Sequence, residues 1–188
     1  MPWHKAIEIK APTSLPEYAN IAAMKEQAFL LLGSNQGQPY EQLATARHHI
    51  AAQLGQVIAA SSIYQTAAWG KTDQPDFLNQ VLVLHTELDA HSLLQGMLAI
   101  EQAMGRQRLE YMGPRVIDID LLAFGQAVID EPGLQVPHPR IAARRFVLIP
   151  LQEVAPNWIH PLLGSTASTL LAVCPDSLNV NKFYPPQP

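Results

Sequence analysis

The chain has 188 residues, with 12 Lys and Arg against 16 Asp and Glu, so its formal net charge at pH 7 is −4. This length predicts one globular domain with a sizeable core, and 48% hydrophobic against 15% charged residues excludes the disordered class. A small acidic excess gives no reason to expect a nucleic acid or an anionic membrane as a partner. No apolar run approaches the roughly 20 residues that span a bilayer.

The single cysteine, Cys174, excludes an intrachain disulfide framework and a multi-thiolate metal site. The N-terminus lacks the continuous apolar stretch of a secretory signal, so we expect the protein in the reducing cytoplasm. Residues 1–26 show no sustained periodicity and are expected to form a loosely structured extension. One folded domain is expected over residues 27–188.

Glycines and prolines divide the rest of the chain at regular intervals into apolar segments of strand and helix length. In chain order, we expect a strand at 28–32, a helix from Pro39 to about Leu54, strands at 57–64 and 77–86, a helix from about His91 to Met104, a strand at 116–124, turns over 125–139 and a last helix from near Ile141. The strand at 77–86 alternates strongly, with Leu78 and Leu82 on one face and Phe77, Asn79 and Val81 on the other.

The resulting order β-α-β-β-α-β predicts the α+β class with a ferredoxin-like arrangement. In that arrangement, a four-stranded antiparallel sheet carries two helices on one face. A turn or hairpin and a helix would follow at the C-terminal end. Because many unrelated functions use this fold, the order by itself assigns no chemistry.

Arginine is concentrated in one window of the chain. Six of the seven arginines fall between positions 106 and 145, and that window contains no lysine. Guanidinium groups are planar, permanently charged donors that match phosphate oxygens. The window therefore indicates a site for a small polyanion, or alternatively a solvated surface face.

Asp118 and Asp120 lie two residues apart in the strand predicted at 116–124, so both carboxylates should point to the same side, about 6.5–7 Å apart at the backbone. Ile117, Ile119 and Leu121 would face the core. Two neighbouring carboxylates repel each other, and a cation between them relieves the repulsion. Magnesium typically uses one or two carboxylates together with substrate phosphates. The alternative is a polar, solvated strand face.

Arg106, Arg108 and Arg115 flank a loop that ends at this acidic strand. Acids that hold a divalent ion beside several guanidinium groups are suited to binding a polyphosphate and offsetting the charge of a transferred phosphoryl group. The chain has no GxxxxGK[ST] motif, which excludes a P-loop enzyme. Gly105 and Gly113 would let the loop close as a lid, or would simply form a helix stop and a turn.

Two further positions carry candidate binding groups. His138 lies between two prolines in an extended segment and is either a phosphate donor or a structural hydrogen-bonding group. Phe77 and Asn79 share a strand face, where a ring can stack on a heterocycle and an amide can bind its polar edge. The core alone would explain Phe77, whereas a buried Asn79 needs hydrogen-bond partners.

Several motifs together carry a family resemblance from about Ala28 to Pro161. They are Leu32-Gly-Ser-Asn35, Tyr64-Gln-Thr66, Asp73-Gln-Pro-Asp-Phe-Leu-Asn79, Ile100-Glu-Gln-Ala-Met-Gly-Arg106, Gly113-Pro-Arg-Val-Ile-Asp-Ile-Asp120, Val136-Pro-His138 and Arg144-Arg-Phe-Val-Leu-Ile-Pro-Leu151. With them, the chain resembles the 6-hydroxymethyl-7,8-dihydropterin pyrophosphokinase family of folate biosynthesis. The pair GPRxxDxD and PH at this distance is highly specific.

The resemblance implies a Mg²⁺-dependent transfer of pyrophosphate from ATP to the pterin alcohol, with AMP as the leaving group. Two magnesium ions would lie on Asp118 and Asp120. By resemblance, the ATP site comprises Glu101, Arg106, Arg108, Arg115, Leu121, His138 and Arg144, of which Arg106, Arg108 and Arg115 join the two aspartates in catalysis. The pterin would lie between Phe77 and Phe146, with Asn79 at its polar edge and Thr66, Ala67 and Trp69 forming the wall.

No general base is obvious in these motifs, and a metal-polarised hydroxyl is the hypothesis. The chain also departs from well-known members of the family. Met112 stands in a short loop where those members have a longer, more basic loop ending in Trp, Gly133 replaces a basic residue, and Pro139 replaces an aromatic one. The protein is expected to be a monomer. The alternative function is a ferredoxin-like nucleotide-binding or regulatory module without catalysis.

Overall fold

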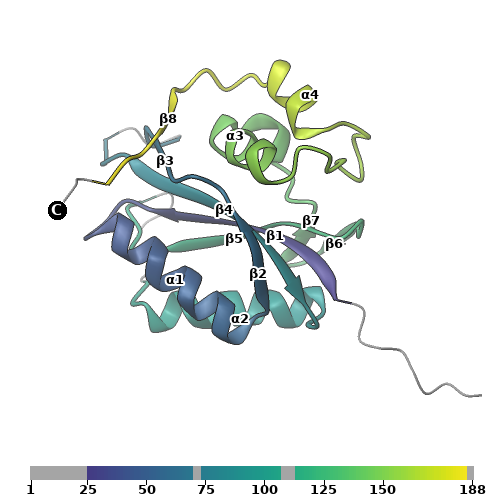
Figure 1. Cartoon of the computed structure of the whole chain (residues 1–188), viewed down its shortest axis with the longest axis horizontal. Coiled ribbons are helices and arrows are strands. Elements are labelled where there is room, and N and C mark those ends of the chain that lie inside the picture. Colours follow the sequence, from purple (N-terminus) through teal and green to yellow (C-terminus); the bar gives the residue numbers. More distant parts are fainter. Residues whose placement is uncertain (1–24, 70–72, 107–112, 186–188) are drawn as a thin grey trace, which may run out of the picture.

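A central antiparallel sheet lies between two layers of helices in the computed structural model, which describes residues 25–69, 73–106 and 113–185 (Figure 1). The elements are β1 (Glu26–Ser34), α1 (Pro39–Gln53), β2 (Gln56–Ala60), β3 (Tyr64–Thr66), β4 (Phe77–Thr86), α2 (Ala90–Ala103), β5 (Asp118–Phe124), β6 (Ile129–Glu131), β7 (Leu134–Val136), a 3₁₀ helix (Ile141–Ala143), α3 (Arg145–Val154), α4 (Ala167–Ala172) and β8 (Val180–Lys182).

The main sheet has the strand order β5-β1-β4-β3-β8, and β2 also pairs with β4. All of these pairs are antiparallel. With β2 and β3 taken as the two parts of one predicted strand, the order of the first seven elements and the antiparallel pairing confirm the predicted ferredoxin-like arrangement. The C-terminal additions are the predicted hairpin, formed by β6 and β7, together with helices and one more strand.

The strand predicted at 57–64 is divided in two. Ser61 lies at the break, where its side chain accepts a hydrogen bond from the Val81 N–H and its carbonyl accepts one from the Gln80 side chain. These bonds keep the chain beside β4 while it leaves the regular ladder. Apolar residues continue across the break, so the sequence pattern does not mark it.

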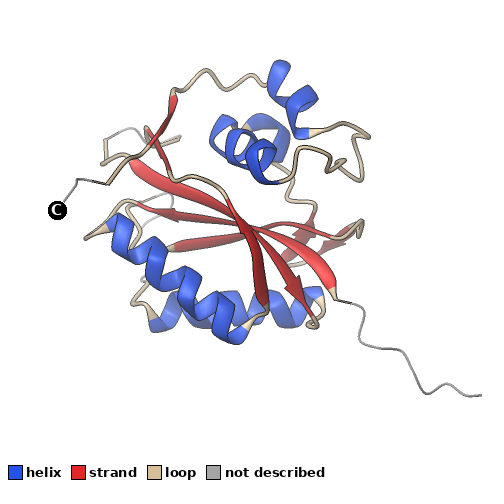
Figure 2. Cartoon of the chain, in the orientation of Figure 1, coloured by secondary structure: helices blue, strands red, loops and turns tan. Residues whose placement is uncertain are grey.

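Helices cover both faces of the sheet, whereas the prediction placed them on one face only (Figure 2). Leu30, Leu32 and Leu82 pack with α1 and α2, as predicted. Phe29 and Leu31 point the other way and pack with α3 and α4. Because β1 is apolar on both faces, a second helical layer is needed to bury it.

Two C-terminal features differ from the expectation. The residues near Ile141 form a short 3₁₀ helix, and α3 begins only at Arg145, whose N–H donates to the Asp176 carboxylate at 2.9 Å. The unpredicted β8 pairs with the outer edge of β3. Glu153 of α3 then joins this edge to the helical layer, since its carboxylate accepts the Tyr64 hydroxyl at 2.7 Å.

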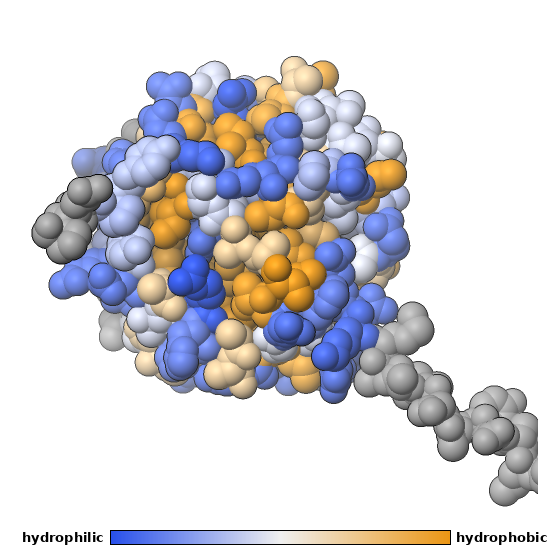
Figure 3. Space-filling model, viewed as in Figure 1, coloured by the Kyte–Doolittle hydropathy of each residue, from blue (hydrophilic) through white to orange (hydrophobic). Residues whose placement is uncertain are grey.

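The face of the molecule in Figure 3 has apolar residues at its centre, over the sheet edge between the two helical layers, with polar residues around them. In β2, Ile58 is 41% exposed. Within the described ranges, no helix is long and apolar enough to cross a membrane.

The turn between α1 and β2 depends on Gly55. Its φ is +146°, and an added Cβ would lie 2.4 Å from the backbone oxygen of His85. We therefore expect Gly55→Ala to lower the free energy of unfolding by about 3 kcal/mol, from backbone strain and the clash together. Gly164→Ala is the matched control, because Gly164 also has a positive φ but open space around it. The control should cost about 1–2 kcal/mol in urea denaturation, and equal losses would contradict the clash.

Candidate functional site

The register of three strands brings the predicted polar residues onto one face of the sheet. Gly33 of β1 pairs with Asn79 of β4 on one side and with Asp118 of β5 on the other. In the next row on the same face, Leu31 lies between Val81 and Asp120. Val81 and Leu31 pack under α3 and α4, which identifies this face as the one that those helices cover.

Gly33 leaves a gap between the amide and the aspartates. A Cβ at this position would lie 3.1 Å from the Asn79 Oδ1 atom and 3.9 Å from the Phe77 ring. Asn79 and Asp118 stand two strand spacings apart, about 10 Å. The missing side chain lets the Asn79 amide lie close over the Gly33 backbone, with Asn79 and Phe77 on one side of this glycine and Asp118 on the other.

Asp118 and Asp120 share this face, and Ile117, Ile119 and Leu121 pack into the opposite core, as predicted. Burial, followed by repulsion from Asp118, raises the pKa of Asp120 to about 6. The positive charges of Arg144 and Arg115 oppose this shift. The two carboxylates therefore act on each other electrostatically, which is the condition under which a cation between them is stabilising.

Three cationic and acidic side chains surround Asp118. Arg106 lies 2.6 Å from the Asp118 Oδ1 atom, and Arg115 pairs with the other carboxylate oxygen. Arg106 also pairs with Glu101, which is 3% exposed. Both oxygens of Asp118 are thus held by guanidinium groups.

Glu101 fixes this network to the sheet. Its Oε1 atom accepts a hydrogen bond from the Ile119 N–H at 2.7 Å, and Ile119 is the residue between Asp118 and Asp120. Burial raises the pKa of Glu101, while the Ile119 N–H and Arg106 act in the opposite direction. Glu101, which the resemblance placed at the nucleotide, is therefore positioned to orient Arg106 and β5.

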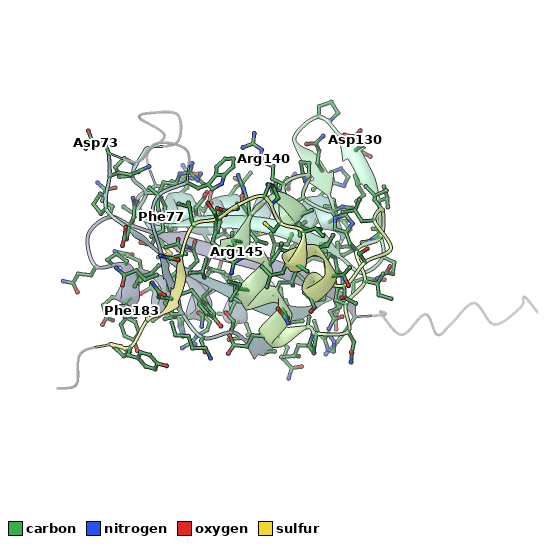
Figure 4. The ribbon with its side chains drawn as sticks, turned by 90° about the horizontal axis from the view of Figure 1, so that it is seen from above. Asp73, Phe77, Asp130, Arg140, Arg145 and Phe183 are labelled. Carbon is green, nitrogen blue, oxygen red and sulfur yellow. The ribbon has the colours of Figure 1, made fainter. Side chains whose placement is uncertain are left out.

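A pocket of about 700 Å³ opens beside the network. One part of its lining is apolar and comes from α2, β5 and β7, namely Leu94, Leu98, Ile119, Leu121 and Leu134. The other part is charged and contains Arg106, Asp118, Asp120, His138 and Arg140. Figure 4 shows Asp73 along the same edge of the molecule as Arg140 and Asp130, although Asp73 is far from both in sequence.

His138 reaches this pocket because its backbone N–H bonds to the Leu122 carbonyl on the edge of β5 at 2.8 Å. Its Nδ1 atom accepts the Arg140 N–H at 3.1 Å, so a neutral ring carries its proton on Nε2. Burial, then the charges of Arg144 and Arg140, lowers the pKa of His138 to about 4. At neutral pH, the ring is therefore an uncharged donor facing the charged part of the pocket.

The residues predicted at the pterin gather on the other side of Gly33. Asn79 is 3% exposed, and its Nδ2 donates to the Thr66 Oγ1 at 2.8 Å. The Arg144 guanidinium carbon lies 5.2 Å from the centre of the Trp69 ring and 5.6 Å from that of Phe146. Ala67 is exposed beside Thr66, and half-buried Phe77 begins β4.

Arg108 and Met112 lie outside the described residues, as does nearly all of the predicted N-terminal extension. In the part of the chain that is described, no cluster of three or more His, Cys, Asp or Glu side chains could hold a metal ion. A metal at this face would therefore take at most the two aspartates from the protein and its remaining ligands from elsewhere, as magnesium does with phosphates and water.

Asn35 has a role here that reasoning from the sequence missed. Its Oδ1 accepts the Arg115 N–H at 2.8 Å, and its Nδ2 donates to the Pro75 carbonyl at 3.0 Å. One buried carboxamide thus joins the segment before β5 to the segment before β4. A polar Ser-Asn pair directly after a buried apolar strand was the available signal.

The family model of 7,8-dihydro-6-hydroxymethylpterin-pyrophosphokinase (HPPK) matches residues 29–156. The chain belongs to this family. The match confirms the resemblance and the predicted activity, a pyrophosphokinase acting on the hydroxymethyl dihydropterin of folate biosynthesis. It covers every predicted site residue, although it does not test the role of any one of them.

Relatives named 2-amino-4-hydroxy-6-hydroxymethyldihydropteridine pyrophosphokinase support the assignment. The one from Methylorubrum extorquens is 46% identical over 147 residues, which are 78% of this chain and 92% of the relative. The one from Pseudomonas aeruginosa is 39% identical over 153 residues, 81% of this chain and 94% of the relative.

Solved structures show the same fold. A crystal structure of a Plasmodium falciparum HPPK-DHPS triple mutant matches with a TM-score of 0.67 at 20% identity, over 79% of this chain. A second HPPK-DHPS structure, in complex with substrates, matches with a TM-score of 0.66 at 16% identity. This chain covers 44% and 43% of those two chains.

The lowered pKa of His138 predicts an acid-dependent loss of stability. The unfolded chain takes up a proton on this ring near pH 6.5, but the folded chain does so only near pH 4, so the stability falls as the pH drops through this window. Between pH 8 and pH 5, the free energy of unfolding of His138→Gln should fall by about 1–2 kcal/mol less than that of the wild type, after allowance for solvent screening. Urea denaturation at both pH values tests this, and an identical loss in both proteins would contradict the burial of the ring.

Proposed function

We propose that this protein transfers the pyrophosphoryl group of ATP to the hydroxymethyl oxygen of 6-hydroxymethyl-7,8-dihydropterin, giving AMP and the pterin diphosphate, and that the transfer depends on Mg²⁺. The row Asn79–Gly33–Asp118 carries this proposal. The row places Asn79, which can bind a heterocycle, and Asp118, which can serve a polyphosphate, on either side of Gly33. A reaction between two such substrates requires the two groups to be this close.

ATP would occupy the pocket of about 700 Å³. The leucine-rich part suits a purine base, and the part with Arg106 and His138 suits phosphates. The Nε2–H of neutral His138 would donate to a phosphate oxygen without adding a charge. Arg115, Arg144 and Arg108 would complete the phosphate contacts, while Glu101 orients Arg106 and Leu121 lines the base.

The pterin would lie between Phe77 and Phe146, with Thr66, Ala67 and Trp69 as the adjoining wall. The Nδ2 atom of Asn79 donates to Thr66, and the Oδ1 atom of Asn79 lies over Gly33. This oxygen would accept a hydrogen bond from an N–H at the edge of the heterocycle. Thr66 therefore determines which end of the Asn79 amide faces the substrate.

Asp118 and Asp120 would hold Mg²⁺, two ions in our proposal, which would offset the negative charge of the triphosphate when bound. The pair fits such a role because both carboxylates face one side and one of them is only weakly acidic. Arg106 and Arg115 pair with the Asp118 oxygens, and with Mg²⁺ on Asp118 phosphate oxygens would be suitable partners for both guanidinium groups.

In the reaction, the pterin oxygen would form a bond to the β-phosphorus as the bond from that phosphorus to the α,β-bridging oxygen breaks. AMP would take the electron pair of the broken bond, and the hydroxyl proton would pass to solvent. Positioning and charge stabilisation are the main contributions that a protein makes to such transfers. The arginines, Asn79 and the aromatic residues supply both.

We propose that the active form is a monomer. We further propose a single catalytic domain over residues 27–188, with residues 1–26 as an extension outside it. The cytoplasmic location expected from the sequence stays a prediction. The alternative function is a binding module without catalysis, and one measurement, the release of AMP, distinguishes it from the enzyme.

Incubation of the full chain with ATP, Mg²⁺ and the hydroxymethyl dihydropterin should release AMP and not ADP. Replacing Mg²⁺ by EDTA should stop the release. A reaction without the pterin is the control for hydrolysis. Nucleotide binding without any AMP release would support the binding module instead.

Asp118→Asn and Asp120→Asn should each lower kcat by about three orders of magnitude or more, because the phosphoryl group loses its charge stabilisation. Asp120→Asn relieves the crowding of the acidic pair and should leave the thermal midpoint unchanged or higher, whereas Asp118→Asn deprives Arg106 and Arg115 of their carboxylate partner and should lower it. Glu41→Gln, an exposed acid in the first turn of α1 that does not line the pocket, is the control for the loss of a carboxylate and should keep near-normal turnover. Near-normal turnover of either catalytic-site variant would remove the metal assignment.

Phe146→Ala should weaken pterin binding by about tenfold and ATP binding by less, because the ring would stack on the pterin directly, whereas it contacts Arg144 together with the Trp69 ring, which remains. Phe183→Ala, directly after β8, controls for the loss of a ring. Titration calorimetry with each substrate separately gives the two affinities. Equal losses for both substrates would argue against the aromatic sandwich.

A further inference from the structure

The side chain of Arg144 is held by rings and not by acids. Its guanidinium carbon lies over Trp69 at 5.2 Å and over Phe146 at 5.6 Å, measured to the ring centres. Trp69 comes from the loop after β3 and Phe146 from the first turn of α3, so the contact joins two segments 77 residues apart in sequence. Arg144 itself is the residue immediately before α3.

Among the residues that the structure describes, the Arg144 side chain forms no hydrogen bond and no ion pair, and its Nε atom is buried without a partner. The other two described arginines of the phosphate site differ, because Arg106 and Arg115 both pair with Asp118. Asp120 attracts the Arg144 charge, but no carboxylate lies within ion-pair distance of it. The two rings are therefore the close contacts that define where the guanidinium lies.

Aromatic rings hold a guanidinium without using its N–H donors. A carboxylate partner would occupy two of those donors, whereas a ring attracts the cation through its face. A guanidinium held in this way keeps its donors available for phosphate oxygens. It also needs no exchange of partners when a polyanion arrives, unlike Arg106 and Arg115.

We propose that Trp69 is a positioning residue for the nucleotide. Its ring, together with that of Phe146, holds the Arg144 guanidinium in place and leaves the N–H donors of that group available to the polyphosphate. The inference rests on the proposed function, in which Arg144 contacts the phosphates. Neither Trp69 nor Arg144 lines the 700 Å³ pocket. The charge of Arg144 interacts with Asp120 and Asp118, which do line it, and Trp69 would act on the nucleotide through its contact with Arg144. The same ring is proposed to form part of the pterin wall, and the two roles separate when the pterin is absent.

The experiment measures the binding of Mg²⁺ and α,β-methylene ATP by calorimetry, without pterin. Trp69→Leu keeps apolar bulk but removes the aromatic face and should weaken binding about fivefold, while Trp69→Phe should stay within about twofold of the wild type. Tyr184→Leu, an exposed aromatic residue 78% accessible to solvent, is the control for the loss of a ring. Thermal unfolding confirms that each variant is folded.

Arg144→Met separates this inference from the function on which it rests. If Arg144→Met weakens nucleotide binding and Trp69→Leu adds nothing to it in the double variant, the inference holds. If Arg144→Met weakens binding and Trp69→Leu alone binds like the wild type, Trp69 belongs to the pterin wall only and the inference is overturned. Unchanged binding by Arg144→Met would overturn both the inference and the proposed contact of Arg144 with the phosphates.

Discussion

The pairing of β1 with β4 and with β5 is the constraint on which the site depends. Because side chains alternate along a strand, one register places Asn79, Gly33 and Asp118 in a single row, and Asp120 next to that row. A slip of one residue would turn the aspartates into the α1 and α2 core and bring isoleucines to the surface under α3. The apolar residues of both strand faces therefore determine the position of the polar ones.

Charge balance explains how so many ionic groups coexist on this face. Glu101, Asp118 and Asp120 face Arg106, Arg115 and Arg144, and the raised pKa of Asp120 indicates how crowded the acids are. Arg106 and Arg115 have carboxylate partners, and Arg144 has two aromatic rings. A polyphosphate would bind each guanidinium more strongly than these partners do. The partners therefore hold the three arginines near the positions in which they would bind the nucleotide.

Patterns with a fixed period were predictable from the sequence. Alternation in residues 77–86 and the spacing of Asp118 and Asp120 correctly gave the faces of β4 and β5, since a strand has a period of two residues. The break at Ser61 and the pairing of β8 with β3 were not predictable, because both arise from contacts between segments distant in the chain. The same reason applies to Asn35 and to the Trp69–Arg144 contact: each depends on which loops the finished fold brings together.

The Asn35 carboxamide is a cross-link between the two halves of the site. It accepts a hydrogen bond from the Arg115 N–H before β5 and donates one to the Pro75 carbonyl before β4, and it is 4% exposed. An outward shift of the segment before β5 would therefore also displace the segment before β4, because the Asn35 side chain binds both. A compound that wedged itself beneath this amide would disturb both halves together, although it would occupy neither substrate's position.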